Sequence, residues 1–295
     1  MYPKKLPASI LGVVAKNPNL SKYQNMLYAK KSLGQNFLRS KAAIFSIIEA
    51  GEIDGHDIVL EVGPGKGILT EELLKVAREV IAVEKDDRLV LFLTLKFKRE
   101  IEEKKLILIH KDILEFDPEE EGLQAGGYKI IANIPYYITG TFLRRFLSVV
   151  SAPSRMVLML QKEVARRIVA RDEKESILSL SIKAYGEPVY IETVKAESFS
   201  PQPKVDSAIL LVKNISKKFF TENGIVENVF FTLIKTGFGQ KRKKLSSNIK
   251  EILGGAEKAA AAFSACNIPE NARAEDAPLS KWKCLARFQG STLEK

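Results

Sequence analysis

Cysteine and histidine are both scarce in this chain of 295 residues, which contains only two of each. Cys266 and Cys284 do not have the spacing of a zinc site, and two late cysteines do not make the disulfide framework of a small secreted protein. We therefore expect no metal site, no disulfide and a reducing, cytoplasmic compartment. His56 and His110 precede or end predicted strands. We interpret both as structural, so no catalytic histidine is expected.

Long hydrophobic runs are absent as well. None approaches the roughly 20 residues that a membrane-spanning helix needs. The apolar run at residues 10–15 is too short for the hydrophobic part of a signal peptide, and Lys16 interrupts it. Internal repeats are also missing. We therefore expect neither a membrane span nor a repeat architecture.

Positive charge is in excess, because 46 Lys and Arg residues stand against 36 Asp and Glu residues, for a formal net charge of +10. This balance favours a polyanionic partner, although many soluble proteins are basic without one. A length of 295 residues with 45% hydrophobic residues suffices for one large domain and a small second one.

A glycine-rich turn follows the first clear strand. Residues 57–62 form a short apolar stretch, Gly63-Pro-Gly65-Lys-Gly67 comes directly after it, and residues 68–77 have the apolar periodicity of a helix. Strand, glycine turn and helix together form the nucleotide-cofactor half-motif of a doubly wound sheet. The spacing matches neither the G-x-G-x-x-G of dinucleotide binders nor a P-loop.

Two acidic residues follow the next two predicted strands. Glu84 ends the stretch 79–84 and lies 21 residues after Gly63, where a carboxylate suits a ribose diol. Asp112 follows the stretch 106–109 and could accept a hydrogen bond from an adenine amino group. An acid after a strand is often only a solvated turn. Several such residues at the carboxyl ends of successive parallel strands indicate a ligand site.

The segment Asn133-Ile134-Pro135-Tyr136 follows the apolar run 128–132. The amide oxygen of Asn133 and the carbonyl of Ile134 can both accept from one exocyclic NH2 group, and the ring of Tyr136 can stack on the base that carries it. The pattern is typical of methyltransferases that modify amino groups of adenine, cytosine or glutamine. Taken alone, it would often be a rigid loop with a packed tyrosine.

If the modified amino group is the N6 of an adenine, methyl transfer needs few chemical groups from the protein. Transfer from a sulfonium is an in-line displacement, so the enzyme mainly positions the partners. Two acceptors on the NH2 group stabilise the positive charge that develops there, and no strong base is needed. The adenine must be flipped out of its stack. Tyr136 on one side and Phe199 on the other could clamp it, and from the residues alone Phe199 could equally be a core residue beside a proline-rich turn.

The chain resembles the KsgA-type ribosomal RNA adenine N6-dimethyltransferases of the small ribosomal subunit. Five segments carry the resemblance: Leu33-Gly-Gln-Asn-Phe-Leu38, Glu61-Val-Gly-Pro-Gly-Lys-Gly67, Asn133-Ile-Pro-Tyr136, Phe199-Ser-Pro-Gln-Pro-Lys-Val-Asp-Ser-Ala208 and Gly237-Phe-Gly-Gln-Lys-Arg-Lys-Lys244. The first and fourth are highly specific to this family and its relatives. Residues 1–29 have no counterpart in the family pattern.

The resemblance implies S-adenosylmethionine as the cofactor and two adjacent adenines in the 3'-terminal hairpin of small-subunit RNA as the substrate. Both adenines would be dimethylated at N6, during small-subunit biogenesis. By position, the predicted cofactor contacts are Gln35, Asn36, Leu38, Gly63, Gly65, Glu84, Asp112 and Asn133. The predicted catalytic set is Asn133, Ile134, Tyr136 and Phe199.

The predicted fold is α/β, a Rossmann-like, doubly wound and mostly parallel sheet with a small C-terminal all-helical domain. We expect a tail over 1–29, a methyltransferase domain over 30–214 and a helical RNA-binding domain over 215–295. Residues 178–194 and 207–212 are predicted as late strands at the sheet edge. Residues 226–252 and 257–263 are predicted as helices.

The densest basic run, Lys241-Arg242-Lys243-Lys244, falls in the first of these predicted helices. A charge run is usually a solvated face. Beside a methyltransferase domain, however, this run is better interpreted as a patch that contacts RNA phosphates. Five arginines could extend it: Arg144, Arg145, Arg166, Arg167 and Arg171.

Three alternatives remain open from the sequence. One is a macrolide-resistance-type methyltransferase, which modifies one adenine of large-subunit RNA. The second is a DNA adenine methyltransferase, although no target-recognition insertion is visible. The third is an RNA-binding factor without activity, which the intact glycine turn, Glu84 and Asn133 disfavour. We expect a monomer that needs neither a metal nor a membrane.

Overall fold

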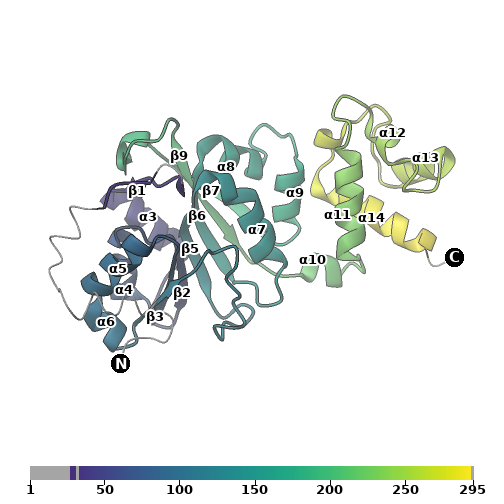
Figure 1. Cartoon of the computed structure of the whole chain (residues 1–295). Coiled ribbons are helices and arrows are strands. Elements are labelled where there is room, and N and C mark those ends of the chain that lie inside the picture. The colour runs from purple at the N-terminus through teal and green to yellow at the C-terminus, as the bar shows by residue number, and fades with distance from the viewer. Residues whose placement is uncertain (1–26, 31–32, 294–295) are drawn as a thin grey trace. The chain divides into compact units, whose positions relative to one another are not determined.

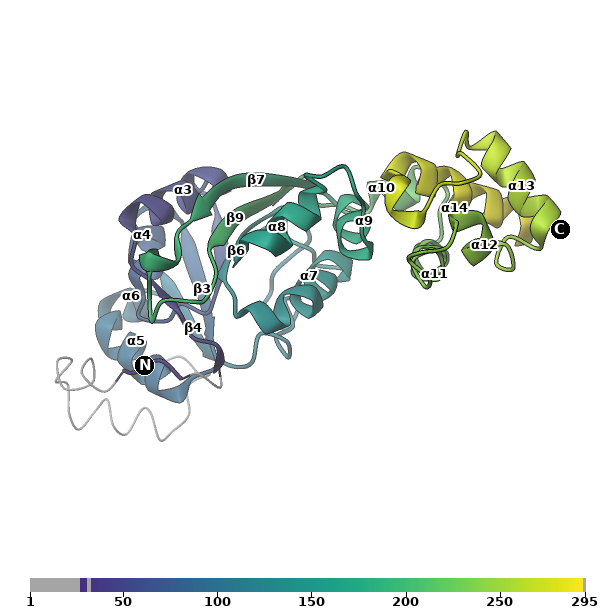
Figure 2. The same ribbon diagram turned by 90° about the horizontal axis from the view of Figure 1, so that it is seen from above.

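A computed structural model describes residues 27–30 and 33–293 of the chain. Contacts divide the chain into two compact units (Figures 1 and 2). The first contains the chain up to Lys162 together with Val189–Ile215, and the second contains Glu163–Pro188 and the chain from Ser216 onward. Residues 163–188 therefore group with the C-terminal helices. The predicted tail lies almost entirely outside the described residues.

The first unit is built on a seven-stranded sheet with the order β4-β3-β2-β5-β6-β9-β7. Five strands run parallel: β2 (Ile58–Val62), β3 (Glu79–Glu84), β4 (Leu106–His110), β5 (Lys129–Asn133) and β6 (Arg155–Gln161). β9 (Ser207–Lys213) is antiparallel to β6, and β7 (Glu187–Val194) lies at the edge beside β9. The strands are almost continuously apolar because helices cover both faces of such a sheet.

Three of the helices that share one core with the sheet are α3 (Lys41–Gly51), α4 (Ile68–Val76) and α5 (Asp87–Lys96). Each presents apolar residues at helical spacing, such as Ile44 and Ile47 of α3, to strand residues including Val59 and Val80. The short helix α6 (Lys98–Glu102) follows α5, and α7 (Thr139–Ser148) buries Phe142 and Phe146. These layers leave the carboxyl ends of the central strands open for a site.

A second, two-stranded sheet joins segments that are far apart in the sequence. β1 (Phe37–Leu38) pairs antiparallel with β8 (Phe199–Ser200), so that Leu38 lies opposite Phe199. The first and fourth of the segments that carry the resemblance are thereby brought side by side.

The second unit is helical. It contains α9 (Ile177–Lys183), α10 (Lys218–Thr221), α11 (Glu227–Gly237), α12 (Leu245–Ile249), α13 (Ala256–Ala265), α14 (Leu279–Leu293) and all but the first residue of α8 (Lys162–Val169). Trp282 of α14 is fully buried against Gly237 of α11. A Cβ on Gly237 would lie only 2.3 Å from Cη2 of Trp282, so glycine is needed for the two helices to approach this closely.

Three expectations about the late part of the chain are wrong. Residues 178–183 belong to helix α9, which a capping box of Ser176 and Ser179 starts, so within the predicted strand 178–194 only β7 is a strand, whereas β9 matches the one predicted at 207–212. The predicted helix over 226–252 is two helices separated by a turn at residues 238–244. Cys266 and Cys284 form a disulfide, because the packing of α13 against α14 brings their Cα atoms to 5.7 Å.

Candidate active site

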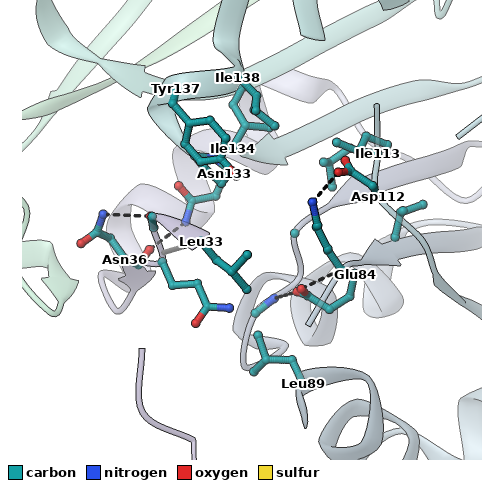
Figure 3. A pocket seen from close by; sticks show the side chains of 18 of the residues that line it. Leu33, Asn36, Glu84, Leu89, Asp112, Ile113, Asn133, Ile134, Tyr137 and Ile138 are labelled. Atoms are coloured by element: carbon teal, nitrogen blue, oxygen red, sulfur yellow. Dashed lines mark hydrogen bonds and ion pairs between the residues drawn. The ribbon is translucent and has the colours of Figure 1, made fainter. Parts of the chain in front are cut away.

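A pocket lies in the first unit where β2, β3, β4 and β5 end (Figure 3). Nearly all the predicted site residues line it: Gln35, Asn36, Gly63, Gly65, Glu84, Asp112, Asn133, Ile134, Tyr136 and Phe199. Figure 3 shows Glu84 and Asp112 on one side of the pocket, and Asn36 and Asn133 on the other. Leu38 instead lines a small adjoining cavity. The ends of the parallel strands thus bring together residues from Gly63 to Asn133 of the sequence.

The glycine turn is held in place from both sides. Gly65 has a left-handed backbone, with φ at +59°, and its N–H donates to Oε2 of Glu84 at 3.3 Å. A Cβ at Gly65 would lie 3.0 Å from Cδ1 of Phe37. Glycine is therefore required both by the backbone conformation and by the close approach of β1. The turn leaves main-chain atoms as the floor of the pocket.

Glu84 is a buried carboxylate with a fixed orientation. Its side chain is only 6% exposed, and Oε1 accepts from the N–H groups of Lys85 and Asp86 at 2.9 and 2.8 Å. Burial raises the pKa of Glu84 to about 7, although the main-chain donors oppose this shift. The fixed geometry suits a carboxylate that accepts hydrogen bonds from ribose hydroxyls.

Replacing Glu84 by alanine should weaken S-adenosylmethionine binding by about 1.5–3 kcal/mol, because charge-assisted bonds to the ribose are lost. Wild-type affinity should also fall as the pH drops below about 7, since protonation of Glu84 removes an acceptor. Glu84→Gln should bind weakly at every pH. Calorimetry between pH 6 and 8 tests both points, and an unchanged affinity would remove Glu84 from the site.

Asp112 follows β4 and faces the pocket from the same side as Glu84. Its Oδ1 accepts from the N–H of Leu114 at 3.0 Å, and its Oδ2 forms an ion pair of 2.6 Å with Lys85. Although partial burial acts in the opposite direction, the ion pair and the N–H hold the pKa of Asp112 below its usual value. Asp112 is therefore an ionised acceptor at the rim of the pocket.

Asn133 ends β5 with its amide oriented by the opposite wall. Its Nδ2 donates to the carbonyl of Asn36 at 3.2 Å, which leaves Oδ1 as the atom that can accept from a ligand (Figure 3). Pro135 follows and holds the corner rigid. The arrangement supplies an acceptor whose direction is set before any substrate arrives.

The two aromatic residues predicted as a clamp have different environments. The hydroxyl of Tyr136 lies 2.7 Å from Oγ of Ser207, a contact that fixes the ring beside the pocket. Phe199 lines the same pocket but is only 4% exposed. The clamp stays a prediction. Tyr137, which the sequence analysis did not single out, also lines the pocket and is 66% exposed.

Asp86 is a further residue of the site that the sequence analysis missed. It is buried and accepts from Nε2 of Gln35 at 3.0 Å, and it forms ion pairs with Lys30 at 3.2 Å and Arg88 at 2.7 Å. Through these contacts with Lys30 and Gln35, Asp86 holds the segment that carries Gln35 and Asn36 close to the end of β3. Its only signal in the sequence is that of an N-cap residue before α5.

Glu61 is a buried carboxyl group on β2 that lines the small adjoining cavity together with Gly63 and Asn133. Its Oε2 has no hydrogen-bond partner among the described residues. Burial raises the pKa of Glu61 to about 8. In the cofactor-free protein at neutral pH this carboxyl is therefore mostly protonated, and a ligand that brings an ammonium group beside the glycine turn would favour its ionised, accepting form.

Glu61→Gln should stabilise the cofactor-free protein at alkaline pH. Below the ordinary pKa of 4.5, Glu61 is neutral in the folded and the unfolded chain and costs nothing. As the pH rises from 4.5 to about 8, the unfolded chain releases its proton first, so the wild type loses stability. Thermal unfolding at several pH values should show the variant gaining on the wild type as the pH rises from about 5 to 9.

The control for this experiment is Glu120→Gln, which changes an exposed carboxylate. Its stability difference from the wild type should stay flat over the same range of pH. An equally flat difference for Glu61→Gln would contradict a buried carboxyl with a raised pKa.

The basic run Lys241–Lys244 lies in the second unit, on the exposed turn between α11 and α12 rather than on a helix. Nδ2 of Asn248 donates to the carbonyls of Gly237 and Gln240 and supports this turn. Lys241 lines a cleft of the second unit that also contains Arg166, Arg167 and Arg171. The other two arginines predicted to extend the patch, Arg144 and Arg145, belong to α7 of the first unit.

Two kinds of site find no support among the described residues. They contain no group of three or more His, Cys, Asp or Glu side chains that could hold a metal ion. No helix within the described ranges is long and apolar enough to cross a membrane. Nε2 of His110 lies 3.2 Å from the carbonyl of Lys85, which agrees with a structural interpretation of this residue.

Comparisons with known proteins point in one direction. A family model described as ribosomal RNA adenine dimethylase matches residues 26–288. The chain is 44% identical over 260 residues to ribosomal RNA small subunit methyltransferase A of Dehalococcoides mccartyi, which covers 88% of each chain. The protein of the same name from Fusobacterium nucleatum is 36% identical over 264 residues, covering 88% of this chain and 98% of that protein.

Solved structures agree on the fold. A dimethyladenosine transferase from Plasmodium falciparum has a TM-score of 0.71 and 25% identity over 84% of this chain and 95% of that chain. The 23S rRNA methyltransferase ErmE has a TM-score of 0.70 and 24% identity over 86% of this chain and 99% of that chain, a likeness that shows the fold alone. The predicted Rossmann-like methyltransferase fold is confirmed.

Proposed function

The chain belongs to the ribosomal RNA adenine dimethylase family, and we propose that it dimethylates N6 of two adjacent adenines in the 3'-terminal hairpin of small-subunit ribosomal RNA. It is an S-adenosylmethionine-dependent methyltransferase, as the resemblance implied. The small subunit is favoured as the substrate because relatives at 34–44% identity are named small subunit methyltransferases. The proposed role is in the biogenesis of this subunit, in the cytoplasm and as a monomer.

The pocket fits the cofactor. The glycine turn leaves its floor open, Glu84 presents a fixed carboxylate for the ribose, and Asp112 offers an acceptor to the adenine amino group. Oε2 of Glu61 is positioned for a donor close to the glycine turn. When bound, S-adenosylmethionine supplies an electrophilic methyl group on a positively charged sulfur.

The orientation of the Asn133 amide carries the proposal. Because Nδ2 is held by the carbonyl of Asn36, Oδ1 accepts from one hydrogen of the target N6, and the main-chain carbonyl of Ile134 accepts from the other. Two such bonds favour a pyramidal nitrogen and strengthen as positive charge develops on it. The alkylated nitrogen then releases its proton without a histidine. Tyr136, held by Ser207, stacks on the flipped base.

The experiment is an incubation of the protein with labelled S-adenosylmethionine and small subunits that lack the modification. Digestion and mapping should find N6,N6-dimethyladenosine at two adjacent positions of the 3'-terminal hairpin. Large subunits and duplex DNA are the matched substrates and should stay unlabelled. Label in large-subunit RNA would instead indicate a macrolide-resistance-type methyltransferase. Label in neither subunit would contradict the proposed activity.

A further inference from the structure

Asp112, which we assign as the acceptor for the cofactor adenine, already accepts hydrogen bonds from other groups of the protein. Both carboxylate oxygens of Asp112 are engaged, Oδ1 by the N–H of Leu114 at 3.0 Å and Oδ2 by Nζ of Lys85 at 2.6 Å. Because a carboxylate oxygen can accept more than one hydrogen bond, an adenine amino group that donates to Asp112 either shares Oδ2 with the ammonium group of Lys85 or displaces it. This conflict concerns a residue to which the sequence analysis gave no role.

The main chain of Lys85 is held by hydrogen bonds, whereas its side chain is largely exposed. Its N–H donates to Oε1 of Glu84 at 2.9 Å, and its carbonyl lies 3.2 Å from Nε2 of His110. The side chain is 54% exposed, whereas that of Asp112 is 24% exposed. An exposed ion pair of this kind is weak and is screened by salt, so its side chains can separate at little cost.

We infer that Lys85 is a latch on the adenine subsite and a determinant of its specificity. This inference rests on the proposed function, because it concerns the cofactor of that same pocket. When an adenine binds, its amino group replaces the ammonium group of Lys85 as the donor to Asp112, and the ion pair separates. A base with an oxygen at this position cannot replace the ammonium, because its oxygen would face a carboxylate. Such a base instead needs Lys85 to stay and donate to both oxygens.

The latch makes two predictions of opposite sign for Lys85→Met. S-adenosylhomocysteine should bind about two- to fivefold more tightly to the variant, since no exposed ion pair has to be broken. The analogue with hypoxanthine in place of adenine should bind about two- to fivefold more weakly, since its oxygen loses a donor. Titration calorimetry of both ligands measures these changes. Neither ligand carries the sulfonium charge, which limits long-range repulsion by lysines.

The matched control is Lys111→Met, which removes the same charge from the same pocket but from a lysine that pairs with Glu120 at 3.4 Å. It should leave the affinity of both ligands near that of the wild type. Equal tightening in both variants would mean general electrostatics and would overturn the latch. So would unchanged or weaker binding of S-adenosylhomocysteine to Lys85→Met.

Salt gives a second measurement on the wild type. Raising the salt concentration from about 0.05 to 0.5 M screens the ion pair, so the affinity of the wild type for S-adenosylhomocysteine should approach that of Lys85→Met. A constant ratio of the two affinities would contradict the latch. Failure of the proposed function is a different result, namely that the wild type binds no adenosyl ligand at all.

Discussion

Asn133→Ala should lower the single-turnover rate of methyl transfer by about a hundredfold or more, while RNA affinity changes little. The two acceptors on the target N6 gain most of their strength as charge develops, so removing one acts on the transition state rather than on the bound substrate. In the structure, Nδ2 of Asn133 donates to the carbonyl of Asn36, which leaves Oδ1 as the atom that can accept. Rapid quench with labelled cofactor and saturating small subunits measures the rate.

Asn133→Asp is the matched variant for this experiment. It keeps an oxygen acceptor but loses the bond from Nδ2 to the carbonyl of Asn36. Its rate should lie between those of the wild type and of Asn133→Ala. Should Asn133→Ala react within a few-fold of the wild type, Asn133 would not be the acceptor and the mechanism would be wrong. A loss of equal size in both variants would instead assign the effect to the contact with Asn36.

The parts of the site that lie at strand ends were predictable from the sequence. Each central strand is a short apolar run that ends in a glycine or a polar residue, as at Gly63, Glu84 and Asn133. Parallel pairing then brings these ends to one edge of the sheet without further information. Family, fold class and activity are confirmed for the same reason, because these local motifs are specific.

Contacts between distant side chains were not predictable. Three such contacts are the pairing of β1 with β8, the hydrogen bond from Gln35 to Asp86 and the ion pair of Lys85 with Asp112. In none of them does the local sequence indicate the partner. The disulfide between Cys266 and Cys284 depends in the same way on how α13 packs against α14. Local sequence also misled at residues 178–183, which were predicted as part of a strand but belong to α9. A short apolar run does not distinguish a buried helix from a strand.

The basic run shows how far a local pattern can be trusted. Its four cations were predicted on a helix, yet they lie on a turn that Asn248 supports. A turn exposes all four side chains at once, whereas a helix would spread consecutive residues around its axis. The exposed turn therefore favours contact of the basic run with phosphates. The cleft that contains Lys241 and three arginines offers a continuation within the same unit.

Removing all four cations should weaken binding to small subunits by roughly 600- to 4,000-fold near 0.1 M salt if each contacts one phosphate. Each phosphate contact contributes roughly 0.7–0.9 to the slope of log affinity against log salt, and at about 0.1 M such a contact is worth roughly five- to eightfold. The slope should thus fall by about three units. The variant carries alanine at Lys241, Arg242, Lys243 and Lys244, and its cofactor affinity should equal that of the wild type.

The control removes the same charge from α6 and the turn after it, by alanine at Lys98, Arg99, Lys104 and Lys105. A general effect of net charge would weaken both variants alike, whereas phosphate contacts by the turn weaken only the first. Filter binding at several salt concentrations separates the two cases, because net charge alone does not lower the slope by one unit for each residue removed. If the first variant binds small subunits with the affinity and the salt slope of the wild type, the basic run is only a solvated turn. The arginines around Arg166 would then be the candidate RNA contact.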